Sequence, residues 1–301
     1  MVGVAVISFT LVRLVPGDVV SILLQAEVGG SQRDIQKIRA YFGIDRPFHE
    51  QLLDYLANVA RGNLGESFRT SRPVAIEIAD RLPVTVQLTL MALLFGVIFG
   101  IPIGIAAAVW RGSFYDVALR PVSILGLSIP SFWLGTLLLL GSSRFVPAVR
   151  LLGYVPFLES PVRNLIAIGV PALALGVGMA ASITRMMRSS MLEVLNQDFV
   201  RTARAKGLAE RTVIWAHVFR NAFIPVLTVI GLEMGTLLGG SIVLEEVFAL
   251  PGLGRLVVIA IKQRDYPLVQ GVTVVVAILF SLVTLVTDLA YARLDPRIRY
   301  G

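Results

Sequence analysis

Long stretches without charged residues constrain this chain more than any other feature. A helix needs about 20 apolar residues to cross the roughly 30 Å hydrocarbon core of a bilayer. Four runs are long enough and contain no charged residue, and a fifth is interrupted only by Glu233. By number, the runs cover residues 82–110, 121–143, 164–184, 266–287 and, with Glu233, 221–244. They predict an all-α, polytopic membrane protein.

The first residues are apolar as well, but residues 1–12 would reach only about 18 Å as a helix at 1.5 Å per residue. No basic flank precedes them, although one normally precedes a first span. We therefore expect residues 1–15 to be the second half of a first membrane helix whose beginning is missing, which makes six transmembrane helices. The segment is a poor signal peptide, because no positive region precedes it and no small-residue cleavage site follows.

Basic residues predict how these helices are oriented. In the short loops, twelve basic residues fall on one face and six on the other, and an excess of Lys and Arg marks the cytoplasmic side. The twelve are Arg111, Arg120, Arg185, Arg188, Arg201, Arg204, Lys206, Arg211, Arg220, Arg293, Arg297 and Arg299. Six spans then place both termini in the cytoplasm, with residues 292–301 as a cytoplasmic tail. The membrane that the chain spans is expected to be the cytoplasmic (inner) membrane.

Composition excludes several classes of function. Only 16% of residues are charged, against about 25% in a soluble domain, so the net charge of +7 orients the chain in lipid and does not indicate a nucleic-acid partner. The absence of cysteine excludes disulfides and thiolate metal sites. Only two histidines are present, so no metal centre is expected.

Residues 16–83 have an ordinary composition, with eight basic and nine acidic residues, and are expected to fold outside the membrane into short helices. Ser31 and Asp34 have capping-box spacing. A second helix is predicted from Pro47 to Gly62, and a third amphipathic piece, at residues 74–81, leads into the second span. This segment either packs over the helix bundle or offers a platform to an extracytoplasmic partner.

The longest cytoplasmic loop, residues 185–220, contains seven basic and three acidic residues. Leu192, Leu195, Phe199 and Ala203 form one apolar stripe, which predicts a single amphipathic helix. Gly207 should break that helix, and a second short helix with exposed aromatic residues should follow over residues 210–220. Such a pair suits insertion into a groove of another protein, or it lies on the lipid headgroups.

The segment from Asp198 through Gly207 to Pro225 resembles the ATPase-coupling loop of ABC importer permeases, in the dipeptide, oligopeptide and nickel branch. Only Ala203 and Gly207 match the general pattern of this loop strictly. Where the sequence departs from that general pattern, its residues resemble those of the peptide branch itself. Segments in the same order as in the branch's first permease subunit are Leu14-Val-Pro-Gly-Asp18, Gly43-Ile-Asp-Arg-Pro47, Gly62-Asn-Leu-Gly-Glu-Ser67, Arg81-Leu-Pro-Val-Thr85, Glu246-Val-Phe-Ala-Leu-Pro-Gly-Leu-Gly254 and Leu294-Asp-Pro-Arg-Ile-Arg299.

This resemblance implies a type I ABC importer permease fold with its core over residues 84–291. It also implies a homologous second permease, two cytoplasmic ATPases that bind ATP and Mg, and an extracytoplasmic substrate-binding protein. The sequence has no Walker A pattern, so no P-loop ATP site is expected in this chain, which is not itself an enzyme. The residues expected to couple to the ATPases are Phe199, Arg201, Ala203, Arg204, Lys206, Gly207, Trp215 and His217.

Candidate residues for the substrate path are few. Glu233 lies within the fifth span, where an ionised carboxylate is costly and a functional role is the default hypothesis; packing is the alternative. Ser128 and Trp133 flank a proline and could line a kinked pore helix. Glu245 and Glu246 follow the span outside, where they would attract a cationic substrate or be solvated.

The substrate is expected to be a small peptide, or alternatively nickel or another solute. An ion-coupled secondary transporter is a less favoured reading, since it would normally place several ionisable residues at the midplane.

Overall fold

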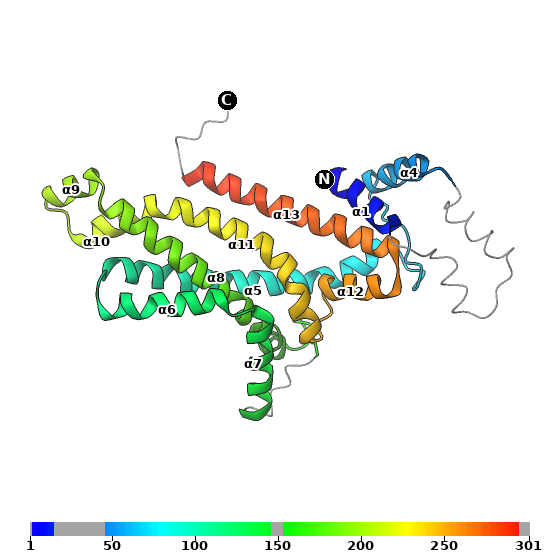
Figure 1. Cartoon of the computed structure of the whole chain (residues 1–301), viewed down its shortest axis with the longest axis horizontal. Coiled ribbons are helices and arrows are strands. Elements are labelled where there is room, and N and C mark those ends of the chain that lie inside the picture. Colours follow the sequence, from blue (N-terminus) through cyan, green and yellow to red (C-terminus); the bar gives the residue numbers. More distant parts are fainter. Residues whose placement is uncertain (1, 15–45, 146–152, 295–301) are drawn as a thin grey trace. The chain divides into compact units, whose positions relative to one another are not determined.

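A computed structural model describes residues 2–14, 46–145 and 153–294, and the elements in these ranges are helices (Figure 1). Four stretches of helix are long and apolar enough to cross a membrane. They are α5 (Val74–Val109), α8 (Pro161–Leu195), the stretch Glu210–Leu237 that ends within α11 (Arg220–Val247), and α13 (Tyr266–Leu294). The predicted helical, polytopic fold is therefore confirmed.

The predicted span at residues 121–143 is sharply bent, at the proline where a kink is expected from the sequence. It is divided between α6 (Phe114–Ser128) and α7 (Ser131–Phe145), which are bent by 97° relative to each other. Ile129 adopts an extended conformation, with φ −81° and ψ 119°, because a residue that precedes proline is pushed out of the helical region. The carbonyl of Pro130 then accepts the amide of Trp133 at 3.0 Å, which starts α7.

A count of six spans remains a prediction. If the bent pair is one span, the described residues contain five. The first helix, α1 (Val2–Leu14), has only 13 residues.

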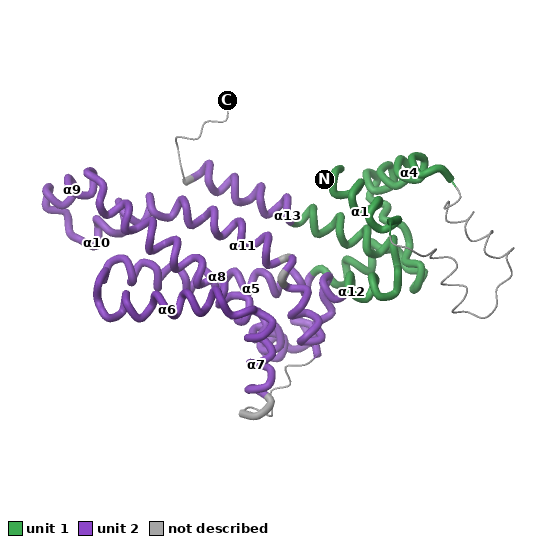
Figure 2. Tube along the Cα trace, in the orientation of Figure 1, with its two compact units in different colours: residues 1–82, 256–279 green, residues 83–255, 280–301 purple. Residues whose placement is uncertain are grey.

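The chain divides into two compact units, coloured separately in Figure 2. Unit 1 combines residues 1–82 with 256–279 and contains α1, α4 (Phe48–Ala60) and most of α12 (Leu253–Gln263). The side chain of Phe9 in α1 is buried and stacks on Tyr55 of α4, with ring centroids 5.1 Å apart. In the same unit, the buried carboxylate of Asp265 accepts hydrogen bonds from the Ser67 hydroxyl and the Phe68 amide.

Helix α4 confirms the helix predicted between Pro47 and Gly62, while the predicted piece at residues 74–81 is continuous with the second span in α5. The helix predicted from Ser31 and Asp34 lies outside the described residues. So do the motif from Leu14 to Asp18, after its first residue, and nearly all of the C-terminal motif.

Unit 2 combines residues 83–255 with 280–301, and α8 is its central helix, in contact with α6, α7 and α11. Helices α5 and α8 approach closely along three glycines of α5 spaced four residues apart. A methyl group at Gly96, Gly100 or Gly104 would lie within 3.0 Å of side-chain atoms of α8, which belong to Met179, Ile183 and Met187, respectively. Small residues at this spacing let membrane helices pack backbone to backbone, so α5 and α8 form one tightly packed pair in this unit.

Candidate functional site

The corner segment, defined here as residues 196–219, connects α8 to α11. The prediction of one continuous amphipathic helix through Leu192 and Ala203 is wrong, because α8 ends at Leu195 and α9 (Asp198–Ala205) begins three residues later. The Asn196 side chain donates to the carbonyl of Leu192 at 2.9 Å. Gln197 is extended, with φ −74° and ψ 149°. An asparagine side chain that hydrogen-bonds the local backbone competes with helix continuation, so the chain turns here.

The turn after α9 is built on Gly207, as predicted. This residue has φ +75°, and a Cβ placed on it would meet nothing within 4 Å. The corner is closed by Arg204, whose Nη2 and Nε donate to the two carboxylate oxygens of Glu210 at 2.6 and 3.1 Å. This hydrogen bond to a carboxylate raises the pKa of Arg204 above its ordinary value. Only a residue that tolerates the left-handed conformation fits position 207 without strain.

The second helix of the corner is not the separate short helix predicted for residues 210–220. A single turn, α10 (Glu210–Thr212), continues through the π-helix η1 (Val213–Phe219) directly into α11. In the view of Figure 1, α9 and α10 lie at one end of the long helices α8 and α11. The corner is therefore attached to α8 across a break of two residues and to α11 without a break.

One side of the corner segment is anchored in the core of unit 2. The side chains of Val200, Ala203, Val213 and Val218 are buried and belong to the same apolar cluster as much of α8. Ala203 was predicted to engage a partner, but the structure places it on this inner side. We infer that it positions α9 against η1, which α9 contacts.

The other side is exposed and combines apolar with basic side chains. We call it the outer face; its members are Phe199, Arg201, Lys206, Leu208 and Trp215. Phe199 and Trp215 are 44% and 52% exposed, and the Trp215 ring lies 5.3 Å from that of Phe219. His217 is half-buried, and its carbonyl accepts from Asn221 at 2.7 Å. An exposed face with large apolar groups and cations has the composition of a protein-docking surface.

The ion pair that closes the corner should contribute little to overall stability. Both side chains are about half exposed, and exposed pairs contribute at most about 1 kcal/mol. We therefore expect Arg204→Ala to lower the free energy of unfolding in detergent by less than about 1 kcal/mol, similar to the control Arg201→Ala. A loss several times larger would mean that this pair holds the corner together.

The assignment of Ser128, Trp133 and Glu233 to a substrate path remains a prediction. In the described part of the chain, Ser128, Trp133 and Glu233 share no hydrogen bond or ring contact with one another. The Ser128 hydroxyl donates to the carbonyl of Ile124 at 2.9 Å, and the Thr236 hydroxyl lies 3.4 Å from the carboxylate of half-buried Glu233. Each of these two contacts stays within a single helix.

Glu245 is expected from the sequence to attract a cationic substrate or to be solvated, and both alternatives are wrong because they require an exposed side chain. Its side chain is fully buried; it accepts the hydroxyl of Thr85 at 2.7 Å and the amide of Arg255 at 3.0 Å. The same Thr85 hydroxyl accepts the amide of Leu253 at 2.8 Å. Carboxylates are stabilised at helix N-termini, so Glu245 and Thr85 together cap the first turn of α12. Glu246, the adjacent residue, is exposed as predicted.

Apolar helices long enough to span a membrane, a sharply bent helix pair and an exposed helical corner together define a polytopic helical membrane protein. Residues 100–300 match the family described as the binding-protein-dependent transport system inner membrane component, and residues 1–89 match the N-terminal part described for the same kind of component. The chain belongs to this family.

Named relatives agree along the whole length. The chain is 41% identical over 322 residues to the di/tripeptide transport system permease protein DppB of Pseudomonas aeruginosa, covering 99% of this chain and 94% of that one. It is 41% identical over 297 residues to the glutathione transport system permease protein GsiC of Escherichia coli, with 99% and 94% covered. A solved inward-facing MetNI methionine ABC transporter is similar in fold, with a TM-score of 0.57, 21% identity, and 72% of this chain and 96% of that one covered.

Proposed function

We propose that this chain is the permease subunit of an ATP-driven importer that moves small peptides across the cytoplasmic membrane. The observation that carries the substrate class is the full-length similarity to a di/tripeptide permease at 41% identity. A glutathione permease at the same identity fits this class, because glutathione is itself a small peptide. Import of nickel or of another solute is the alternative that the experiment below tests.

The corner segment is the part of this chain that we propose meets the motor. Its outer face would enter clefts of two cytoplasmic ATPases, which bind ATP and Mg. A homologous second permease would complete the pathway, and a binding protein would deliver substrate from outside. Both termini then lie in the cytoplasm. The attachment of the corner to both α8 and α11 supports this assignment, since a displaced corner would pull on two long helices at once.

Transport would follow from closure of the ATPases on ATP. Closure moves the corner, and α8 and α11 rock with it, so that the pathway opens alternately to the two sides, as in a rigid-body transition. The buried contacts of Val200 and Val213 make the corner part of the packed unit, because a packed core transmits strain instead of absorbing it.

The decisive experiment reconstitutes the full complex in proteoliposomes with its binding protein. A dipeptide, a tripeptide, glutathione and Ni²⁺ are then compared for uptake and for stimulation of ATP hydrolysis. We expect ATP-dependent uptake of the peptides. Uptake of Ni²⁺ alone would overturn the substrate class, and uptake by the isolated chain driven by an ion gradient would overturn the ATP-driven mechanism.

Glu233 is proposed to contact the amino group of the substrate in the path. Hydrogen bonds to charged groups contribute about 1.5–3 kcal/mol, so we expect Glu233→Gln to lower peptide import by about tenfold. Import should be measured for a peptide with a free amino group and for its N-acetylated form, which would lose less. The control is Glu159→Gln, at an exposed position. Unchanged import of the free peptide would refute this role for Glu233.

A further inference from the structure

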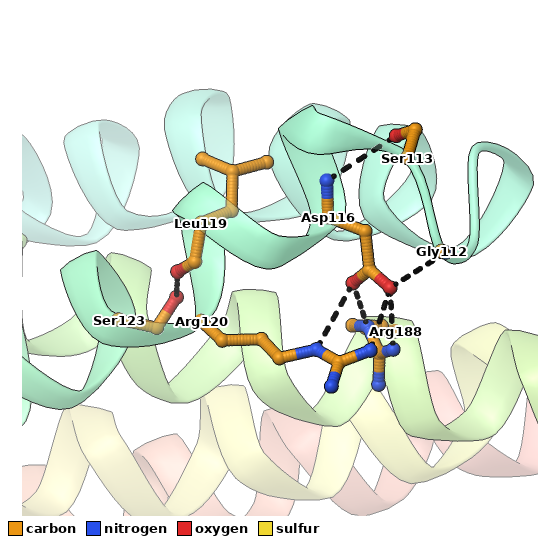
Figure 3. A network of polar contacts seen from close by, with 7 residues as sticks. All are labelled: Gly112, Ser113, Asp116, Leu119, Arg120, Ser123 and Arg188. Atoms are coloured by element: carbon orange, nitrogen blue, oxygen red, sulfur yellow. Dashed lines mark hydrogen bonds and ion pairs between the residues drawn. The ribbon is translucent and has the colours of Figure 1, made fainter.

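Asp116 is the one residue of α6 that the structure shows as buried, although it is an aspartate in a helix of mostly apolar residues. Its side chain has no solvent exposure. Arg188 of α8 donates from Nε and Nη2 to the two carboxylate oxygens, at 2.7 and 3.0 Å. Arg120 adds a bond of 2.7 Å and the Gly112 amide one of 3.0 Å, so that both carboxylate oxygens are engaged (Figure 3). Burial of a charge is tolerated when it is paired and hydrogen-bonded in this way.

Apolar packing between α6 and its neighbours is incomplete further along the helix. A cavity of about 280 Å³ lies between α5, α6 and α8 and is lined by apolar groups such as Phe95, Val122 and Leu173. On the outer surface of α6, Val117, Ile124 and Leu125 are more than half exposed. At the start of α6, the Asp116 and Arg188 side chains provide a direct polar contact to α8.

Arg188 lies on the helix that leads into the corner segment, seven positions before α8 ends at Leu195. The preceding residue, Met187, packs against Gly104 of α5 where α5 and α8 lie closest together. At the far end of α6 is the bend at Pro130 that leads into α7. The ion pair thus connects the helix pulled by the corner to the broken helix of the same unit.

We propose that Asp116 and Arg188 form a latch that makes α6 move together with α8, so that displacement of the corner segment reaches the bend between α6 and α7. Both are positioning residues, and the inference rests on the proposed function of the corner. The bidentate geometry suits such a latch, because two parallel bonds to the guanidinium fix the orientation as well as the distance.

The first test replaces Asp116 with asparagine in the reconstituted complex, and import and ATP hydrolysis are measured together. Coupling free energies between sites commonly correspond to changes of 5- to 150-fold, so we expect peptide imported per ATP hydrolysed to fall about tenfold while hydrolysis continues. The matched control is Glu193→Gln, which removes a carboxylate from an exposed position on α8. An unchanged ratio in Asp116→Asn would overturn the latch.

A reversible cross-link separates the latch from a general loss of folding. A Cβ at Gly126 of α6 would lie 3.1 Å from the Cβ of Ala181 of α8, so the two helices need to separate by only a few tenths of an ångström to reach the roughly 3.5–4.5 Å between the Cβ atoms of a disulfide. The chain has no cysteine of its own, so Gly126→Cys with Ala181→Cys gives one defined bond. With Asp116 intact, we expect oxidation to leave import unchanged. In the Asp116→Asn background, oxidation should restore the ratio and reduction should lower it again.

Import that stops on oxidation with Asp116 intact would show that α6 slides past α8 during transport, and the latch would be wrong. Failure of the proposed function gives a different pattern, in which even the unsubstituted complex shows no ATP-dependent import. A loss of coupling in a Gly207 variant together with a normal ratio in Asp116→Asn would overturn this inference alone.

Discussion

Gly207→Val is expected to lower ATP-driven import by about tenfold or more, while the chain still inserts into the membrane and assembles with its partners. Gly207 has φ +75°, a conformation that costs an ordinary residue about 1–2 kcal/mol and a β-branched residue more. The chain can relieve this strain by opening the corner, which would displace the outer face from its position between α8 and α11. Import and ATP hydrolysis in proteoliposomes, with assembly checked by co-purification, measure the effect.

Two further variants separate geometry from bulk. Gly62 also has a positive φ, +78°, with open space around its Cβ, but it lies outside the corner segment, so Gly62→Val carries a similar backbone cost and should leave import nearly normal. Gly207→Asn keeps a residue that tolerates the left-handed conformation and should retain much of the activity. Normal import by Gly207→Val would refute the coupling role of the corner.

Hydrophobic runs predicted the membrane helices well because transfer into lipid depends mainly on local composition. Their ends were less predictable. Helix α5 starts at Val74 and α8 runs on to Leu195, well beyond the charge-free runs. An apolar run marks only the part of a helix that crosses the hydrocarbon core, so it does not show where the helix itself ends. The break at Ile129 has a local cause in Pro130, which was visible in the sequence as a candidate kink.

The polar anchors of unit 2 could not be found in the same way. The partners of Asp116 and Glu245 include Arg188 and Thr85, which are 72 and 160 positions away along the chain. No local pattern encodes such a pairing. A weak sequence indicator exists for Asp116 alone, since Ser113 three residues earlier is the N-cap of α6 and accepts its amide. Ala203 shows the converse, because a stripe pattern does not tell whether its apolar face meets a partner or the chain's own core.

Glu245→Leu is expected to lower the free energy of unfolding by about 3 kcal/mol. The carboxylate is fully buried and accepts hydrogen bonds from the Thr85 hydroxyl and the Arg255 amide. Each buried donor left without a partner costs about 1–3 kcal/mol. A leucine fills the space but accepts neither donor. Part of this loss is offset, because the leucine variant no longer has to bury a charged carboxylate, whose desolvation destabilises the folded state. Denaturant titration of the detergent-solubilised chain measures the change.

Glu246→Leu is the matched control for this prediction, since it removes the same charge one residue further along. The Glu246 carboxylate is 44% exposed and lies 3.5 Å from the guanidinium of Arg255, a geometry that contributes at most about 1 kcal/mol. Glu245→Gln should fall between the two, because its amide oxygen can still accept one of the donors. Equal losses in Glu245→Leu and Glu246→Leu would show that charge near this helix end, and not the buried cap, determines stability. A larger loss in Glu245→Leu alone would identify the cap as the contact that holds the start of α12 to α5 and α11 within unit 2.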